Sequence, residues 1–250
     1  MLATIQGTIV RRVLVNYRVR PEAIERHLPA PFRPQLVDGW SIAGICLIGL
    51  RDIRPVWLPA CFGCTSENAA HRIAVEWDEQ DSIRTGVFIP RRDSSSVVNH
   101  MAGGRLFPGE HHAAKFTVHE DAERVRVEFF SHDATTSVRV VAEICDSPPA
   151  GSVFRDTAEA SSFFKSGCIG YSARAHSPKL DGVELCCNAW NMRALNVQTV
   201  SSSFFDDPSR FGKGEVAFDS AFIMRHVPHR WVGRPEKTTS RAVSYANVPV

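Results

Sequence analysis

Two adjacent histidines and a lysine stand where a turn rich in glycine and proline runs into a strand-like stretch. Residues 111–118, HHAAKFTV, alternate as in a β-strand, whose successive side chains point to opposite faces. His112 therefore shares a face with apolar residues such as Phe116, whereas Lys115 lies on the other face. We predict that His112 points into the protein, where an imidazole can transfer protons near neutral pH, and that Lys115 points outward.

An inward histidine does not by itself establish a site, because a lone buried histidine is more often a hydrogen-bonded core residue. The two histidines also cannot readily bind one metal ion, since neighbouring strand residues face opposite ways. The residues alone leave two interpretations of His112 open, a working group or an ordinary core histidine.

Three more polar residues stand at strand ends and could join such a site. Glu67 begins an alternating strand, Arg105 lies in the glycine-arginine turn before the histidines, and Arg91 ends the strand GVFIPR. Arginine clamps a carboxylate through two hydrogen bonds, and glutamate and histidine can act as acids and bases. Converging at a barrel mouth, they would suit a small carboxylate. The alternative is that Glu67 forms an ordinary ion pair and that Arg91 is a solvated strand end.

Composition narrows the class of protein. The 250 residues carry a net charge of +2, too balanced for nucleic acid or an anionic membrane as the main partner. No apolar run approaches the ~20 residues that span a bilayer, and the N-terminus lacks the apolar core of a signal peptide, so we expect a cytoplasmic protein. Cys61 and Cys64 form a C-x-x-C with no second pair at zinc spacing, which favours bystander thiols. We expect no metal and no cofactor.

The first third of the chain predicts strands with little helix. Residues 4–19 form a long strand, and Pro21 opens a short helix over 21–28. Residues 39–50 are apolar on both faces, which indicates a strand covered on both sides. A long loop is predicted over 51–66 because prolines and cysteines replace the periodic pattern.

The rest of the chain continues the β pattern. Two hairpins are predicted over 115–146, and further strands lie within 169–225. Short helices are predicted over 95–104 and 156–166, and residues 232–250 are expected to be loosely attached. About nine strands against three short helices predict one mostly β (α+β) domain over residues 1–250. We expect a curved antiparallel sheet that closes into a cone or barrel, with a few short helices outside.

The order of three segments resembles the acetoacetate decarboxylase superfamily, and more closely an uncharacterised bacterial family within it. The segments are VNYRVRPEAIERHLPAPFRP at 15–34, GCTSENAAHRIAVEW at 63–77, and the run at 86–116 that contains the glycine-arginine turn. The resemblance covers roughly the first half of the chain. It implies the same cone-shaped fold and a pocket for a small keto acid.

The resemblance also implies roles for particular residues. Gly104 and Arg105 match the family's glycine-arginine pair, and Glu67 matches its glutamate beside the reactive amine. Counted without gaps, the Schiff-base lysine falls on His112 and the next lysine on Ala113. The implied pocket therefore lacks the amine nucleophile, because an imidazole cannot form the iminium on which that decarboxylation depends.

Three functions remain compatible with the sequence. The first is a lyase-like enzyme on a small keto acid or related carboxylate, with His112 and Glu67 as acid and base and Arg105 and Arg91 binding the ligand. The second is a non-catalytic binding or sensing protein on the same scaffold, and the third a structural protein without a ligand. Neither nucleic acid nor a membrane is an expected partner, and the sequence leaves a homo-oligomer open.

Overall fold

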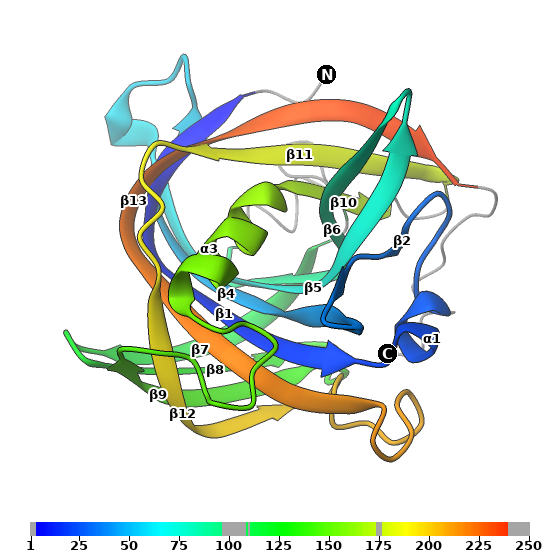
Figure 1. The fold of residues 1–250 in the computed structure, drawn as a ribbon. Helices are drawn as coiled ribbons and strands as arrows, with labels where there is room; N and C mark the ends of the chain where they lie inside the picture. The colour runs from blue at the N-terminus through cyan, green and yellow to red at the C-terminus, as the bar shows by residue number, and fades with distance from the viewer. Residues whose placement is uncertain (1–3, 97–108, 110, 174–176, 240–250) are drawn as a thin grey trace.

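The chain is built almost entirely from one mixed β-sheet (Figure 1). A computed structural model describes residues 4–96, 109, 111–173 and 177–239. The strands are β1 (Ile5–Val19), β2 (Arg33–Pro34), β3 (Leu36–Val37), β4 (Trp40–Pro55), β5 (Cys64–Glu79), β6 (Ser82–Ser94), β7 (His111–Glu120), β8 (Arg124–Ser131), β9 (Ser137–Cys145), β10 (Ile169–Ala173), β11 (Lys179–Cys187), β12 (Arg193–Ser202) and β13 (Val216–Thr238). The helical segments are α1 (Pro21–Glu25), the 3-10 turn η1 (Ala60–Phe62) and α3 (Thr157–Ser166). The predicted mostly β fold is thus confirmed.

The strand pairings close two rings that share a wall. The first ring has nine strands, in the order β6, β7, β8, β9, β12, β13, β1, β4 and β5, and β5 pairs back to β6. The second has seven, because β10 pairs with β6 and β11 pairs with β13. Strands β13, β1, β4, β5 and β6 belong to both rings. Figure 1 shows β7, β8, β9 and β12 on one side of this wall and β10 and β11 on the other.

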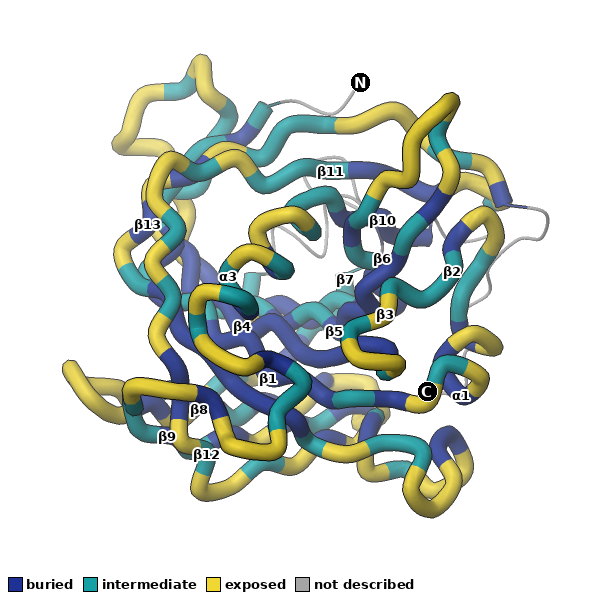
Figure 2. Tube along the Cα trace, viewed as in Figure 1, coloured by how far each residue is buried: buried dark blue, intermediate teal, exposed yellow. Residues whose placement is uncertain are grey.

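The shared wall explains why residues 39–50 are apolar on both faces. Side chains alternate along a strand, so every second residue of β4 faces the nine-stranded ring and the others face the seven-stranded ring. Leu47 accordingly joins a core with Val127 and Phe129 of β8, whereas Ile48 joins a second core with Met224 of β13. Figure 2 shows long buried stretches along β1 and β4 in the middle of this wall.

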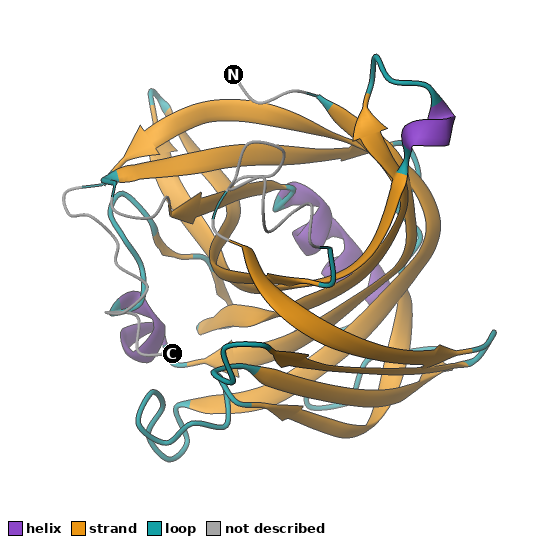
Figure 3. Cartoon of the chain, turned by 180° about the vertical axis from the view of Figure 1, so that it is seen from behind, coloured by secondary structure: helices purple, strands orange, loops and turns teal. Residues whose placement is uncertain are grey.

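Helix α3 begins and ends as the sequence predicts. The Asp156 side chain accepts a hydrogen bond from the Glu159 backbone N–H, which caps the helix start. The helix does not lie outside the barrel, however. Phe164 packs with Phe222 in the second core, and α3 lies across the seven-stranded ring in front and rear views (Figures 1 and 3). Aromatic side chains on one helix face favour this position because they need an apolar surface to cover.

Several predicted boundaries need correction. The loop predicted over 51–66 shortens to 56–63, since β4 continues to Pro55 and β5 begins at Cys64. The C-terminal segment is not loose up to Thr238, because β13 pairs there with Lys179 of β11. The helix predicted over 21–28 is shorter in the structure, where α1 ends at Glu25. Of the helix predicted over 95–104, only the first two residues lie within the described ranges. No helix in the described part of the chain is long and apolar enough to cross a membrane.

Candidate functional site

A cavity of about 120 Å³ lies inside the seven-stranded ring. Every strand of that ring contributes to its wall, in chain order through Arg12, Ile48, Arg72, Ile89, Gly170, Leu185 and Trp231. The junction between α3 and β10 covers one side through Cys168. The site is therefore held by the most extensively paired part of the sheet, which gives its side chains fixed positions.

Arg72 of β5 is the most deeply buried arginine of this cavity, with an exposed fraction of 4%. Its Nη2 donates to the Asn16 Oδ1, and its guanidinium lies 4.7 Å from the centre of the Phe164 ring. Its Nε has no hydrogen-bond partner among the described residues. Burial lowers the pKa of Arg72 to about 10, so the guanidinium stays charged at neutral pH.

Arg12 of β1 supplies a second guanidinium to the same cavity. Its Nε donates to the Cys46 Sγ at 3.4 Å, and its guanidinium lies 5.3 Å from the centre of the Trp190 ring. Its Nη1 is buried without a hydrogen-bond partner within the described ranges. Neither Arg12 nor Arg72 forms an ion pair with a described carboxylate. A buried guanidinium, Arg72, and a half-buried one, Arg12, neither of them in an ion pair with a described residue, favour an anion as occupant of the cavity.

The β6–β7 edge of the cavity carries further polar groups. His111 of β7 and Arg92 of β6 are opposite each other in the parallel pairing, and both line the cavity. The Arg92 Nε donates to the Ser172 Oγ at 3.2 Å, which fixes this side chain toward β10. Asn68 of β5 also lines the cavity and accepts a hydrogen bond from the Ser94 hydroxyl at 2.7 Å.

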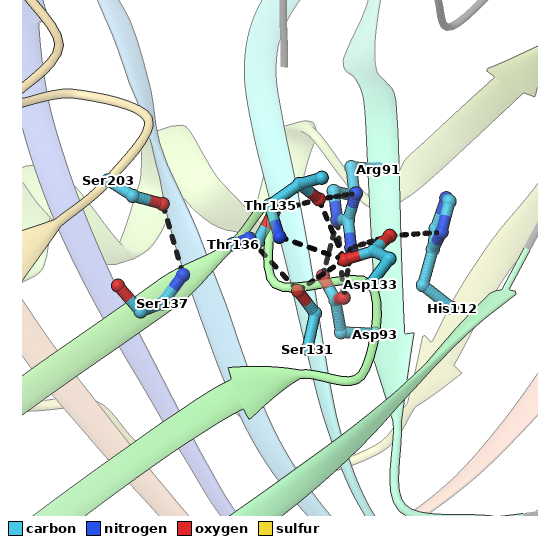
Figure 4. Close-up of polar contacts among 9 residues, drawn as sticks. All are labelled: Arg91, Asp93, His112, Ser131, Asp133, Thr135, Thr136, Ser137 and Ser203. Atoms are coloured by element: carbon cyan, nitrogen blue, oxygen red, sulfur yellow. Dashed lines mark hydrogen bonds and ion pairs between the residues drawn. The ribbon is translucent and has the colours of Figure 1, made fainter.

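His112 and Arg91 are brought together, but away from this cavity (Figure 4). The His112 Nδ1 lies 3.1 Å from the Asp133 Oδ2, and the Arg91 Nη2 lies 3.0 Å from the same oxygen. Arg91 also binds the fully buried Asp93 at 2.9 Å. By strand alternation the His112 and Arg91 side chains face the nine-stranded ring, whereas Asp93 is also among the residues that line the cavity. As predicted, His112 shares its face with the core residue Ala114, and Lys115 is exposed.

Electrostatics of this second group are those of a compensated ion cluster. Burial would raise the pKa of Asp133, but hydrogen bonds from Ser131 and Thr135 hold it well below its usual range. Burial raises the pKa of Asp93, and the Arg91 guanidinium opposes the rise. Each charge in the cluster has an opposite charge within hydrogen-bonding distance, so nothing in it calls for an added ion.

Glu67 belongs to a third group, and Arg105 lies outside the described residues. The buried Arg11 donates to Glu67 through Nη2 and to the Glu120 Oε1 through Nη1 at 2.8 Å. Burial raises the pKa of Glu67, and Arg11 opposes the rise. Glu67 is not among the residues that line the cavity, although its neighbour Asn68 is.

The sequence interpretation did not find Arg12, Arg72, Cys46 or His111 as site residues. A signal was present, because Arg12 and Arg72 interrupt long apolar strands. In an ordinary sheet such residues face water. In this protein both faces of the strand are covered, and an arginine in a doubly covered strand indicates an enclosed polar site.

Comparison with known proteins agrees with this architecture. Acetoacetate decarboxylase from Legionella pneumophila superposes with a TM-score of 0.62 at 11% identity, over 93% of this chain and 87% of that one. An acetoacetate decarboxylase-like enzyme from Sphingomonas wittichii RW1 gives 0.58 at 15% identity, over 94% and 92%. The enduracididine biosynthesis enzyme MppR, solved in complex with pyruvate, gives 0.53 at 16% identity, over 94% and 89%. No curated protein matches the sequence.

These likenesses define the class of protein, a β-rich chain with the fold of the acetoacetate decarboxylase-like enzymes. The sequence matches a family over residues 8–206, most of the chain. The protein belongs to this family, DUF2071, described as an uncharacterized conserved protein. The predicted uncharacterised family is thereby confirmed, as is its structural similarity to acetoacetate decarboxylase-like proteins.

Proposed function

We propose that this protein binds a small keto acid or related carboxylate inside the seven-stranded ring and acts on it by acid–base chemistry. The observation that carries the proposal is a pair of guanidiniums, the buried Arg72 and the half-buried Arg12, which line one cavity without an ion pair to a described carboxylate. A buried cation is costly unless an opposite charge accompanies it. A bound carboxylate supplies that charge, and arginine is well suited to hold it.

The size of the cavity fits this ligand class. A volume of about 120 Å³ exceeds several times the ~30 Å³ that a water molecule occupies in the liquid. Apolar residues such as Ile48 and Leu185 line the remainder, which suits a short carbon chain. MppR, which has the same fold, has been solved with pyruvate and with a condensation product of pyruvate. That precedent supports a ligand of similar size and charge in this protein.

The acid–base role falls to His111 in this proposal, because it lines the cavity. Imidazole titrates near neutral pH, so it can both accept and donate a proton. Three residues that do not line the cavity have positioning roles in this proposal, namely His112, Arg91 and Glu67. The His112–Asp133–Arg91 cluster braces β6 and β7 where Arg92 and His111 stand, and Glu67 braces β1 through Arg11, the neighbour of Arg12. Arg105 remains a proposed ligand contact from the sequence resemblance.

A Schiff-base mechanism is not part of the proposal. No lysine is among the described residues that line the cavity, and Lys115 is exposed. The same observation favours the second candidate function, a binding or sensing protein that keeps the pocket and performs no reaction. The two functions share the ligand class and differ in turnover.

A panel of small acids tests the proposal. Pyruvate, acetoacetate and 2-ketobutyrate are added separately to the protein and followed by ligand-detected NMR, with the matching amides as uncharged controls. The acids should bind and the amides should not, because the arginines recognise the carboxylate. Equal binding of acids and amides, or no binding at all, contradicts the proposal. Loss of ligand signal with time identifies an enzyme, and stable signals identify a binding protein.

A further inference from the structure

Cys46 stands between the two arginines of the cavity. In the sheet Cys46 of β4 is opposite Leu14 of β1 and opposite Ala70 of β5. Arg12 and Arg72 are each two residues from those partners, and residues two apart in a strand share a face. The three side chains therefore meet on the cavity side of three adjacent strands, where the thiol is 8% exposed.

The Cys46 sulfur is in direct contact with one of these arginines. The Arg12 Nε–H donates to the Cys46 Sγ at 3.4 Å. Thiols beside arginine are the ones that ionise and react as nucleophiles. Cys168 also lines the cavity, but burial raises its pKa to about 11, which leaves it as the neutral thiol.

A second observation points to a ligand beside this thiol. The Nε of Arg72, a side chain more than nine-tenths buried, has no hydrogen-bond partner among the described residues and belongs to the same cavity wall. A carboxylate bound there would hold the rest of a small ligand within the cavity, next to the Cys46 sulfur. A 2-keto acid carries its electrophilic carbon directly beside its carboxylate, and a nucleophile next to the anion site meets that carbon.

We propose that Cys46 adds reversibly to the keto carbon of a 2-keto acid held by Arg12 and Arg72 and forms a thiohemiketal. The inference rests on the proposed function and supplies the nucleophile in place of a lysine. The sulfur lone pair forms the C–S bond, and the carbonyl π pair moves onto the carbonyl oxygen. The proton released by the thiol ends on that oxygen, and His111, in the same cavity, can carry it. The sum is addition of S–H across C=O, and nothing is oxidised or reduced.

Competitive alkylation tests the thiol itself. The native protein is treated with iodoacetate or iodoacetamide, which differ chiefly in charge, and peptide mass spectrometry measures the labelling rate at each cysteine. The iodoacetate-to-iodoacetamide rate ratio at Cys46 should exceed that at the exposed Cys61 by about tenfold or more, because the arginines concentrate the anion. In the variants Arg12→Met and Arg72→Met the ratio at Cys46 should fall toward that of Cys61. Slow labelling of Cys46 by both reagents, or equal ratios at the two sites, overturns the inference.

A carbon-13 experiment separates this inference from the proposed function. Pyruvate labelled at the keto carbon is added to wild type, Cys46→Ala and the matched control Cys168→Ala. Wild type and Cys168→Ala should give a protein-bound resonance in the tetrahedral carbon region that Cys46→Ala lacks, while Cys46→Ala still binds pyruvate through the arginines. Binding by wild type with the same spectrum as Cys46→Ala overturns the covalent step and leaves the proposed function intact. Absence of pyruvate binding by wild type contradicts both.

Discussion

His111 and His112 are neighbours in β7 whose side chains serve opposite faces of the sheet. His111 lines the cavity of the seven-stranded ring, whereas the His112 Nδ1 lies 3.1 Å from the Asp133 Oδ2. The same offset of one residue recurs on β6, where Arg92 lines the cavity and Arg91 binds Asp93 on the other face. Strand β6 belongs to the wall shared by the two rings, so both of its faces are interior, and it supplies Arg92 to the cavity and Arg91 to the ion cluster.

The first prediction compares the two histidines. His111→Asn should weaken binding of a keto acid about tenfold while the free energy of unfolding changes little, because the side chain faces the cavity. His112→Asn should leave binding nearly unchanged and cost about 1 kcal/mol of stability, because Asp133 loses a hydrogen-bond partner. Ligand titration and urea unfolding on both variants check this. The reverse pattern would restore His112 as the ligand-binding histidine.

A second prediction concerns lysine chemistry. Incubation with pyruvate or acetoacetate and borohydride should leave no reduced adduct on Lys115, which is exposed, and none at His112. Mass spectrometry of proteolytic peptides makes the comparison, with a Schiff-base-forming aldolase as positive control. A stable mass increase mapped to Lys115 would mean that the family's amine chemistry survives at a shifted position.

The third prediction tests the ion cluster behind the site. Arg91→Met should cost about 3–5 kcal/mol of stability, because it leaves the fully buried Asp93 without its compensating charge. The double variant Arg91→Met/Asp93→Leu should recover much of this loss, since no buried charge remains there unpaired. Arg124→Gln, on an exposed side chain of β8, serves as the control. A single variant as stable as wild type would contradict the structural role given to Arg91.

The fourth prediction is a dependence of stability on pH. Burial, together with the positive charges of Arg91 and Arg210, lowers the pKa of His71 from 6.5 to about 3. Between these pH values the unfolded chain binds a proton at His71 that the folded chain does not. Protonation of His71 therefore does not reduce the free energy of unfolding above pH 6.5. As the pH falls from 6.5 toward 3, the free energy of unfolding decreases by about 1.4 kcal/mol per pH unit.

Replacement of His71 isolates this contribution. His71→Leu should reduce the slope of unfolding free energy between pH 6 and 4 by about 1.4 kcal/mol per unit, because leucine binds no proton. His132→Gln, at an exposed position, should keep the wild-type slope. Urea unfolding at several pH values measures all three proteins. An unchanged slope for His71→Leu would show that His71 is protonated in the folded state.

The sequence predicts the fold of this protein better than its site, and β5 illustrates why. Alternation along 71–77 identifies the strand and its two faces correctly, as does the capped helix over 156–166. Alternation cannot say which face meets a cavity when both faces are covered, because that depends on how distant strands close the rings. Alternation places Arg72 on the face opposite to that of His71. It does not show that this face meets a cavity, which Arg72 lines. Likewise, alignment without gaps selects His112 as the candidate histidine, whereas His111 is the one that lines the cavity, and which of them acts on a ligand stays a prediction.

Calorimetric titration of pyruvate into wild type and Arg72→Met measures directly how much the Arg72 guanidinium contributes to binding of a carboxylate. Arg72 is buried, lines the same cavity as Arg12 and forms no ion pair with a described carboxylate, and we propose that its charge binds the ligand. Arg72→Met should bind pyruvate at least about tenfold more weakly than wild type, and its melting temperature should be unchanged or higher. Equal affinity in the two proteins, combined with a lower melting temperature for Arg72→Met, would contradict it.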